Sequence, residues 1–206
     1  MASPPLPWLK PAVLVGGLSP LALLLVQGLQ GELGANVIEV VLNQTGLLTL
    51  VFLMASLACT PLKLLFAWTW PLRLRKLLGL MAFAYAVLHF LTYAVVDQGL
   101  ALGRIFQDVT ERGFIAVGFL ALMLLVPLAV TSTNASVRRL GFPAWQRLHR
   151  LVYVAAVLGV VHFVWRVKKD LTEPLIFGAI LALLLGIRAV EAVRKRRRVR
   201  STPRPA

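Results

Sequence analysis

Histidine is the residue type whose chemistry and placement in this chain point most directly to a function. Two of the three histidines lie inside apolar stretches, His89 in LLGLMAFAYAVLHFLTYAVV and His162 in LVYVAAVLGVVHFVW. An ionisable side chain within hydrocarbon is costly and usually has a functional role. Because neutral imidazole is a common axial ligand of haem iron, the pair predicts a bis-histidine b-type haem and electron transfer across a membrane.

The elements that must position these histidines are membrane helices. Hydrophobic residues make up 59% of the 206-residue chain, and its mean hydropathy is +0.81. Both values are far above those of an ordinary soluble domain. A span needs about 20 mostly apolar residues, and six segments qualify: about 11–29, 47–66, 77–96, 114–132, 150–166 and 174–190. The sequence predicts an all-α integral membrane protein, a six-helix bundle over 1–190 with a basic tail over 191–206.

Three local features concern the first span, the loop that follows it and the single cysteine. No small-x-small cleavage motif follows the first apolar run, so we expect a retained helix rather than a removed signal peptide. The longer loop QGELGANVIEVVLNQTG, residues 30–46, is expected to hold a short amphipathic helix at the membrane interface. The single cysteine, Cys59, excludes an internal disulfide and argues against a thiolate metal cluster.

Basic residues predict the orientation of the bundle. All but five of the 22 lysines and arginines fall on the side that carries both termini, whereas seven of the eight acidic residues fall on the other. Cytoplasmic loops are rich in lysine and arginine, so both termini are expected in the cytoplasm. The net charge of +14 is then explained by topology and by a tail that contacts anionic lipid. Nucleic-acid binding is not expected, because no recognition module accompanies the charge.

His89 and His162 are predicted to lie at similar depths. His89 is twelve residues into the third span, which places it roughly 18 Å from the cytoplasmic end at 1.5 Å per residue. His162 is thirteen residues beyond His149, at the cytoplasmic end of the fifth span, which places it roughly 20 Å from that end. If the third and fifth helices are neighbours, the imidazoles face each other across a porphyrin; alternatively, each histidine hydrogen-bonds an adjacent helix. Nearby aromatic residues could line a porphyrin and are equally ordinary in a membrane core: Phe83, Tyr85, Phe90, Tyr93, Phe163 and Trp165.

His149, at the start of the fifth span, has two alternative roles. It lies about 140° around an ideal helix from His162, and its counterpart in the third span is Lys76. A second bis-histidine site is therefore not expected from these helices. His149 is either an interfacial hydrogen-bonded residue or a ligand or neighbour of a second redox group. Basic loops on the same face offer cations for haem propionates, a flavin phosphate or lipid headgroups, or simply set the topology: Arg75, Lys76, Arg138 and Arg139.

Three stretches of the chain resemble a known family. They are RLRKLLGLMAFAYAVLHFLTY (73–93), TSTNASVRRLGFPAWQRLHRLVYVAAVLGVVHFVW (131–165) and GANVIEVVLNQTG (34–46). They are similar to the MsrQ (YedZ) family, the haem-binding membrane subunits of bacterial MsrPQ systems, within the ferric-reductase-like transmembrane superfamily. The resemblance implies that His89 and His162 bind haem, that His149 is an additional family histidine, and that FMN is associated with the cytoplasmic face.

The resemblance also implies a route for electrons. They would pass from the quinone pool, or from a cytoplasmic flavin reductase, across the bacterial inner membrane to MsrP, a periplasmic molybdopterin enzyme. MsrP reduces methionine sulfoxide in damaged proteins, so this chain would be an electron-transfer subunit rather than the catalytic one. The wider superfamily often has a second histidine near Lys76 and a flavin and NADPH domain after the last span. Here a short basic tail follows that span, so a separate electron donor is expected.

Three alternatives compete with this interpretation. The histidines could form the proton relay of a coupled transporter, although no acidic residue lies well inside a span and no inverted repeat with broken helices is visible. The chain could be another haem b oxidoreductase such as a ferric reductase, or a cofactor-free scaffold for a partner enzyme. A visible absorption spectrum separates the haem proteins from the other two.

Overall fold

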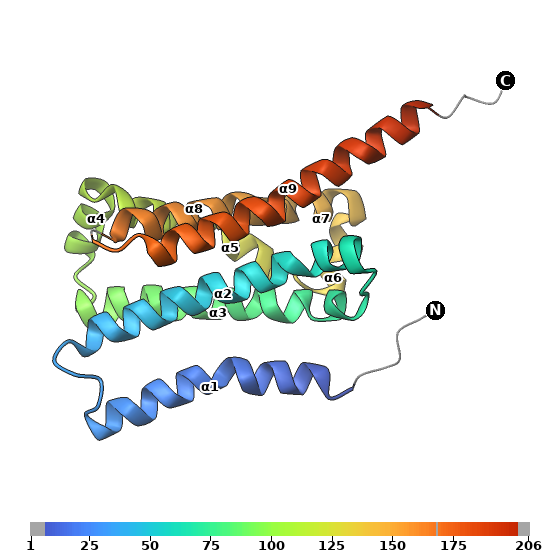
Figure 1. Cartoon of the computed structure of the whole chain (residues 1–206). Helices are drawn as coiled ribbons and strands as arrows, with labels where there is room; N and C mark the ends of the chain where they lie inside the picture. Colours follow the sequence, from blue (N-terminus) through green and yellow to red (C-terminus); the bar gives the residue numbers. More distant parts are fainter. Residues whose placement is uncertain (1–6, 168, 202–206) are drawn as a thin grey trace.

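The computed structural model describes residues 7–167 and 169–201, and helices make up most of this part of the chain (Figure 1). The helices are α1 (Leu9–Gln30), α2 (Val37–Phe66), α3 (Arg75–Leu91), α4 (Leu102–Glu111), α5 (Gly113–Val130), α6 (Asn134–Leu140), α7 (Phe142–His149), α8 (Leu151–Arg166) and α9 (Thr172–Ser201). A short 3-10 helix, η1 (Trp70–Arg73), precedes α3, and a π-helical turn, η2 (Thr92–Asp97), continues it.

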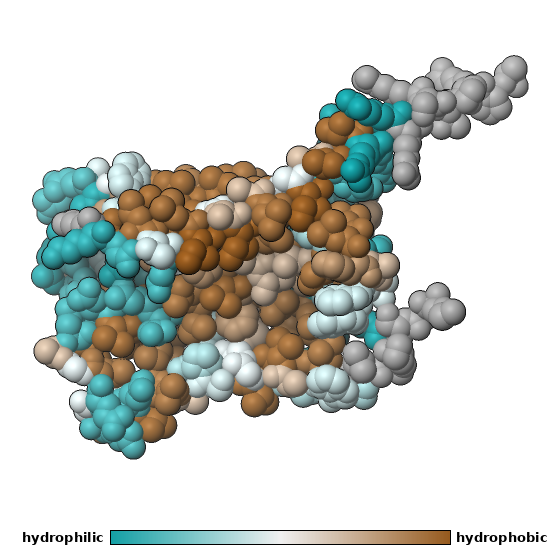
Figure 2. All heavy atoms as spheres, in the orientation of Figure 1, coloured by the Kyte–Doolittle hydropathy of each residue, from teal (hydrophilic) through white to brown (hydrophobic). Residues whose placement is uncertain are grey.

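Within the part of the chain that the structure describes, six helical segments are long and apolar enough to cross a membrane. They are Leu9–Gln30, Val37–Phe66, Arg75–Asp97, Gly113–Val130, Phe142–Arg166 and Thr172–Arg197. Apolar side chains cover the middle of the bundle and hydrophilic ones gather at its two ends (Figure 2). The predicted all-α architecture with six spans is confirmed.

Two helix pairs form the centre of the bundle, α2 with α3 and α5 with α8. Helix α9 packs on α8 and α2, and α1 contacts α3 from the outside (Figure 1). Small and branched residues fill the space between the pairs: Leu50, Leu53, Leu57, Ala82, Leu125, Ala155, Ala156 and Val160. The Tyr85 hydroxyl donates to the carbonyl of Gly17 at 2.6 Å, which ties α1 to α3. The two central pairs therefore form the packed centre of the molecule, and they carry the half-buried residues His89 and His162.

The segment 30–46 differs from the prediction, because it does not form a separate interfacial helix. Asn36 caps α2: its side chain accepts from the Glu39 N–H at 3.2 Å and donates to the Glu39 carboxylate at 2.9 Å. Such a reciprocal cap starts a helix, and nothing breaks it before the apolar run, so α2 extends over 30 residues. The amphipathic helix at this end of the bundle is α4, which exposes Leu102 and Phe106.

The last two spans also extend beyond their predicted limits. The fifth begins at α7 and is interrupted at Arg150, where α7 ends and α8 begins. The sixth continues as α9 to Ser201, so most of the predicted basic tail is a helical extension with exposed side chains from Glu191 to Arg197. The beginning of α1 and the end of α9 lie at the same end of the bundle (Figure 1).

Candidate functional site

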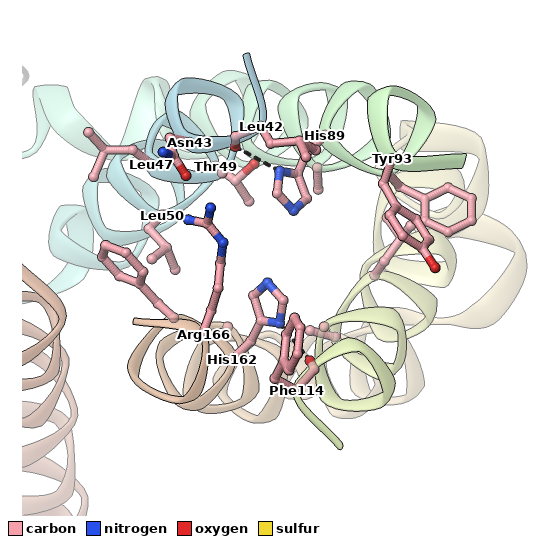
Figure 3. Close-up of a pocket in the computed structure, with 18 of the residues that line it drawn as sticks. Leu42, Asn43, Leu47, Thr49, Leu50, His89, Tyr93, Phe114, His162 and Arg166 are labelled. Atoms are coloured by element: carbon pink, nitrogen blue, oxygen red, sulfur yellow. Dashed lines mark hydrogen bonds between the residues drawn. The ribbon is translucent and has the colours of Figure 1, made fainter. Parts of the chain in front are cut away.

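His89 and His162 lie opposite each other across a cavity between the two central helix pairs. His89 is close to the end of α3 and His162 close to the end of α8. Their ring centres are 6.2 Å apart and their ring planes are inclined by 83°. Figure 3 shows both rings projecting into the same space. The predicted juxtaposition of these two residues is present in the structure.

The cavity has a volume of about 520 Å³, within the range of roughly 300–1,000 Å³ that is typical of cofactor and ligand sites. Its walls come from α2, α3, α5 and α8 and are mainly apolar: Leu42, Leu47, Leu50, Ala86, Phe90, Phe114, Phe119, Leu122, Leu125 and Phe163. Of the aromatic residues considered from the sequence, Phe90, Tyr93 and Phe163 line it, whereas Phe83, Tyr85 and Trp165 are not among its lining residues.

A backbone carbonyl orients each imidazole. His89 Nδ1 lies 3.0 Å from the Leu42 carbonyl oxygen, and His162 Nδ1 lies 2.6 Å from that of Phe114. A carbonyl oxygen only accepts, so Nδ1 carries the hydrogen and Nε2 keeps its lone pair. In Figure 3 the second nitrogen of each ring points into the cavity. Metal-ligating histidines are commonly fixed in this way, by a hydrogen bond from the other ring nitrogen.

Two glycines let the imidazoles approach these carbonyls. Gly46 lies four residues after Leu42 on α2, and Gly118 lies four residues after Phe114 on α5. A Cβ on Gly46 would be 3.2 Å from Nδ1 of His89, and one on Gly118 would be only 2.7 Å from Nδ1 of His162. Each imidazole ring thus packs directly against the helix backbone at a glycine, which has no side chain. The sequence interpretation missed both glycines, although an isolated glycine within an apolar helical run indicates close approach of a neighbour.

The third span changes helical form just beyond His89. The π-helical turn η2 begins at Thr92, and Tyr93 within it lines the cavity. The Tyr93 hydroxyl donates to the Asp108 carboxylate at 2.8 Å, which joins η2 to α4. π-helical turns are uncommon and occur frequently at functional sites. This turn places an aromatic side chain at the end of the cavity next to His89.

The paired imidazoles can bind one metal ion from opposite sides. A metal–imidazole bond is about 2 Å long, so two axial imidazoles on one ion have ring centres about 6 to 7 Å apart. Within the described residues, no group of three or more His, Cys, Asp or Glu side chains could hold a metal ion. The apolar walls suit a flat macrocycle such as a porphyrin, which brings further metal ligands of its own. The residues present fit a haem.

His149 occupies a different place, as the last residue of α7, just before α8 begins. Its Nε2 lies 3.0 Å from the Thr131 hydroxyl, and its ring stacks on Trp145 with centres 4.0 Å apart. Trp145 in turn donates to the Thr131 carbonyl at 3.0 Å. The structure does not bring His149 to the other two histidines, from which it is separated by roughly 20 Å of helix. Its contacts agree with the hydrogen-bonded alternative left open by the sequence and do not test a redox role.

The basic residues named from the sequence are also remote from the histidine pair. Arg75 and Lys76 begin α3, Arg138 and Arg139 lie in α6, and all four are exposed. None of them lines the cavity, so they are not placed to hold propionates of a haem bound there. The arginine that does line it is Arg166, one of the five basic residues that the sequence analysis assigned to the side opposite the termini.

The family described as "Ferric reductase like transmembrane component" matches residues 43–160, more than half of the chain. A protein-methionine-sulfoxide reductase heme-binding subunit MsrQ from Deinococcus radiodurans is 54% identical over 181 residues, which cover 88% of this chain and 89% of the relative. The protein of the same description from Rhodospirillum rubrum is 54% identical over 186 residues, 90% and 89% of the two chains.

A third relative extends the similarity over nearly the whole chain. The Herminiimonas arsenicoxydans protein with the same description is 48% identical over 197 residues, 94% of this chain and 90% of its own. No solved structure matches. The six apolar helices and the transmembrane family together identify a multi-pass membrane protein, and its bacterial relatives fit the inner membrane.

Proposed function

The chain belongs to the MsrQ family of ferric-reductase-like transmembrane proteins, and from this membership we propose that it binds one b-type haem between His89 and His162 and transfers electrons across the membrane. The observation that carries the proposal is the facing pair of imidazoles, each fixed by a backbone carbonyl with Nε2 directed into an apolar cavity. When bound, the haem supplies a one-electron redox centre.

The residues of the cavity orient the two histidines and surround the proposed haem. The Leu42 and Phe114 carbonyls hold both imidazoles in the tautomer that can ligate iron. If His89 and His162 both held the iron, the haem would supply one-electron transfer rather than bind oxygen or a substrate. The mainly apolar walls suit a reaction in which only electrons move. These properties support an electron-transfer subunit rather than a catalytic one.

The descriptions of the relatives support a specific electron acceptor. They are heme-binding subunits of a protein-methionine-sulfoxide reductase, so we propose a periplasmic molybdopterin reductase of the MsrP type as partner. The donor would act at the other face, where the exposed cations Arg75, Lys76, Arg138 and Arg139 lie. A basic surface of this kind suits the phosphate of FMN, bound here directly or carried by a flavin reductase. A quinol from the lipid phase is the alternative donor.

The transporter alternative is not favoured by the geometry. A proton relay needs side chains that exchange protons with successive partners. His89 and His162 instead direct Nδ1 at backbone carbonyls, which accept a hydrogen bond and do not take up the proton. Another haem b oxidoreductase, such as a ferric reductase, would share the cofactor and differ in the electron acceptor.

Absorption spectroscopy of the purified protein tests the proposed function. We expect a Soret band that shifts on reduction, and we expect His89→Ala and His162→Ala each to lose the same haem signal. His149→Ala is the matched control, since it removes an imidazole from the same bundle and should retain that signal. A full wild-type reduced spectrum in either of the first two variants would rule out that residue as an axial ligand. Quinol-driven reduction of methionine sulfoxide by a separately purified MsrP-type enzyme then tests the acceptor.

A further inference from the structure

Arg166 is the charged residue that lies closest in sequence to the histidine pair. It is the last residue of α8, four positions after His162. Residues four apart lie on one face of a helix, so its side chain leaves α8 on the side of the cavity. Figure 3 shows the guanidinium extending across the cavity beside the two imidazoles. Arg166 therefore contributes to the site itself and not only to the charge of the membrane surface.

The guanidinium has little to bind in the polypeptide. In residues 7–167 and 169–201, its ionic contact is with the Glu39 carboxylate, at 3.9 Å. This distance is too long for a hydrogen bond, and the Glu39 side chain is 56% exposed. Glu39 already accepts a hydrogen bond from Asn36 at 2.9 Å. Exposed ion pairs of this kind contribute little, so Arg166 retains donors for another carboxylate.

The other charged side chains that line the cavity within the described residues are carboxylates. Asp170 and Glu173 line it together with Arg166. Hydrogen bonds from Thr172 hold the pKa of Asp170 below its usual range, so this carboxylate is charged at neutral pH. Apart from the histidines, Arg166 is the one basic residue among those that line the cavity in the described part of the chain. An anion that enters here has one cationic partner within the site.

We propose that Arg166 binds a propionate of the haem, fixes that edge of the cofactor toward the end of the bundle that holds Glu39 and Asp170, and raises the haem midpoint potential. The inference rests on the proposed haem. A haem b has two propionates on one edge, and arginine is the side chain best suited to bind a carboxylate by two parallel hydrogen bonds. A positive charge beside the haem stabilises the reduced form, which carries one more electron. Arg166 is thus a positioning and tuning residue, not an iron ligand.

The first test compares three full-length variants in detergent. Arg166→Gln should retain the bis-histidine spectrum, show a lower midpoint potential than wild type, and lose haem to an excess of apomyoglobin about tenfold faster, as expected for the loss of a charge-assisted hydrogen bond. Arg166→Lys keeps the charge without the paired donors and should be intermediate. Arg104→Gln, an exposed arginine that does not line the cavity, should match wild type. Equal potentials and haem-loss rates in Arg166→Gln and wild type would overturn the proposal.

A second test asks whether the carboxylates are the partner. Haem-free wild type and Arg166→Gln are reconstituted with haem b or with haem b dimethyl ester, whose propionates are esterified. We expect the two proteins to differ in potential with haem b and to agree with the ester. A difference that persists with the ester would show that Arg166 acts on something other than the propionates. Failure of wild-type protein to bind either cofactor would instead refute the proposed function, so the two failures are distinguishable.

Discussion

At the scale of single residues, the orientation of each proposed histidine ligand depends on the helix backbone that it contacts. Each imidazole needs a backbone carbonyl within reach of Nδ1 and a glycine four residues later that leaves room for the ring. Leu42 with Gly46 does this for His89, and Phe114 with Gly118 does it for His162. The same arrangement occurs in both central helix pairs. The histidines are therefore oriented before any cofactor binds, which reduces the cost of binding one.

Adding one methyl group at these glycines should weaken haem binding in a graded way. In Gly118→Ala the new Cβ would be 2.7 Å from Nδ1 of His162, so the ring must leave the Phe114 carbonyl; at Gly46 the separation from His89 is 3.2 Å and a small shift suffices. Overpacking of this type costs about 1–3 kcal/mol. We expect lower haem content in Gly118→Ala than in Gly46→Ala, measured as haem per purified protein.

The control for this series is Gly178→Ala, whose Cβ would make an ordinary contact 3.8 Å from Val160. It should bind haem like wild type. Haem content in Gly118→Ala equal to that of this control would show that the close approach does not position His162.

At the scale of elements, the spans were predictable and their ends were not. Long apolar runs fix the number of membrane helices, and the two histidines could be placed at similar depth by counting residues. The ends depend on short-range contacts with weak sequence signals. Because of the Asn36–Glu39 cap, α2 begins at Val37, earlier than the predicted start of the span near residue 47. A break at Arg150 separates α7 from α8. The role of Arg166 also depends on which helices pack together, which residue counting does not reveal.

Helix α7 carries His149, whose role in electron entry can be tested by substitution. It ends in His149, which Thr131 and Trp145 hold at the other end of the bundle from the proposed haem. If electrons enter there, His149→Ala should leave the haem content unchanged and slow reduction by a donor at that face. Stopped-flow reduction at matched haem content measures this. Trp145→Phe, which keeps an aromatic ring and removes the donor to Thr131, separates the imidazole from its packing. Unchanged reduction in His149→Ala would make His149 a structural residue.

At the scale of the whole molecule, charge divides the two ends of the bundle. In the sequence, all but five of the 22 basic residues fall in segments predicted on the side of the termini, and seven of the eight acidic residues fall in segments predicted on the other side. Hydrophilic side chains cap both ends of an apolar middle (Figure 2). Cytoplasmic loops carry the excess of lysine and arginine, so α3 and α8 would both begin at the cytoplasmic face. His89 and His162 are close to the ends of these helices, so the proposed haem would lie nearer the periplasmic face. An acceptor on that side would be well placed to take its electrons.

This orientation predicts the outcome of reporter fusions. A reporter joined after Ala206 should be active only if it functions in the cytoplasm, and one inserted between residues 97 and 113 only if it functions in the periplasm. Paired reporters of the two kinds at both sites provide the control. The reverse pattern would exchange the donor and acceptor sides and contradict the proposed direction of electron flow.

The central claim is that one haem iron has His89 and His162 as its two axial ligands. Near-infrared magnetic circular dichroism of the oxidised purified protein identifies the axial ligand pair directly. We predict a bis-imidazole signature for wild type and an imidazole–thioether signature for His162→Met, with a raised midpoint potential because methionine ligation favours the reduced iron. A wild-type signature of any other ligand pair, or a bis-imidazole signature that persists in His162→Met, would contradict the account.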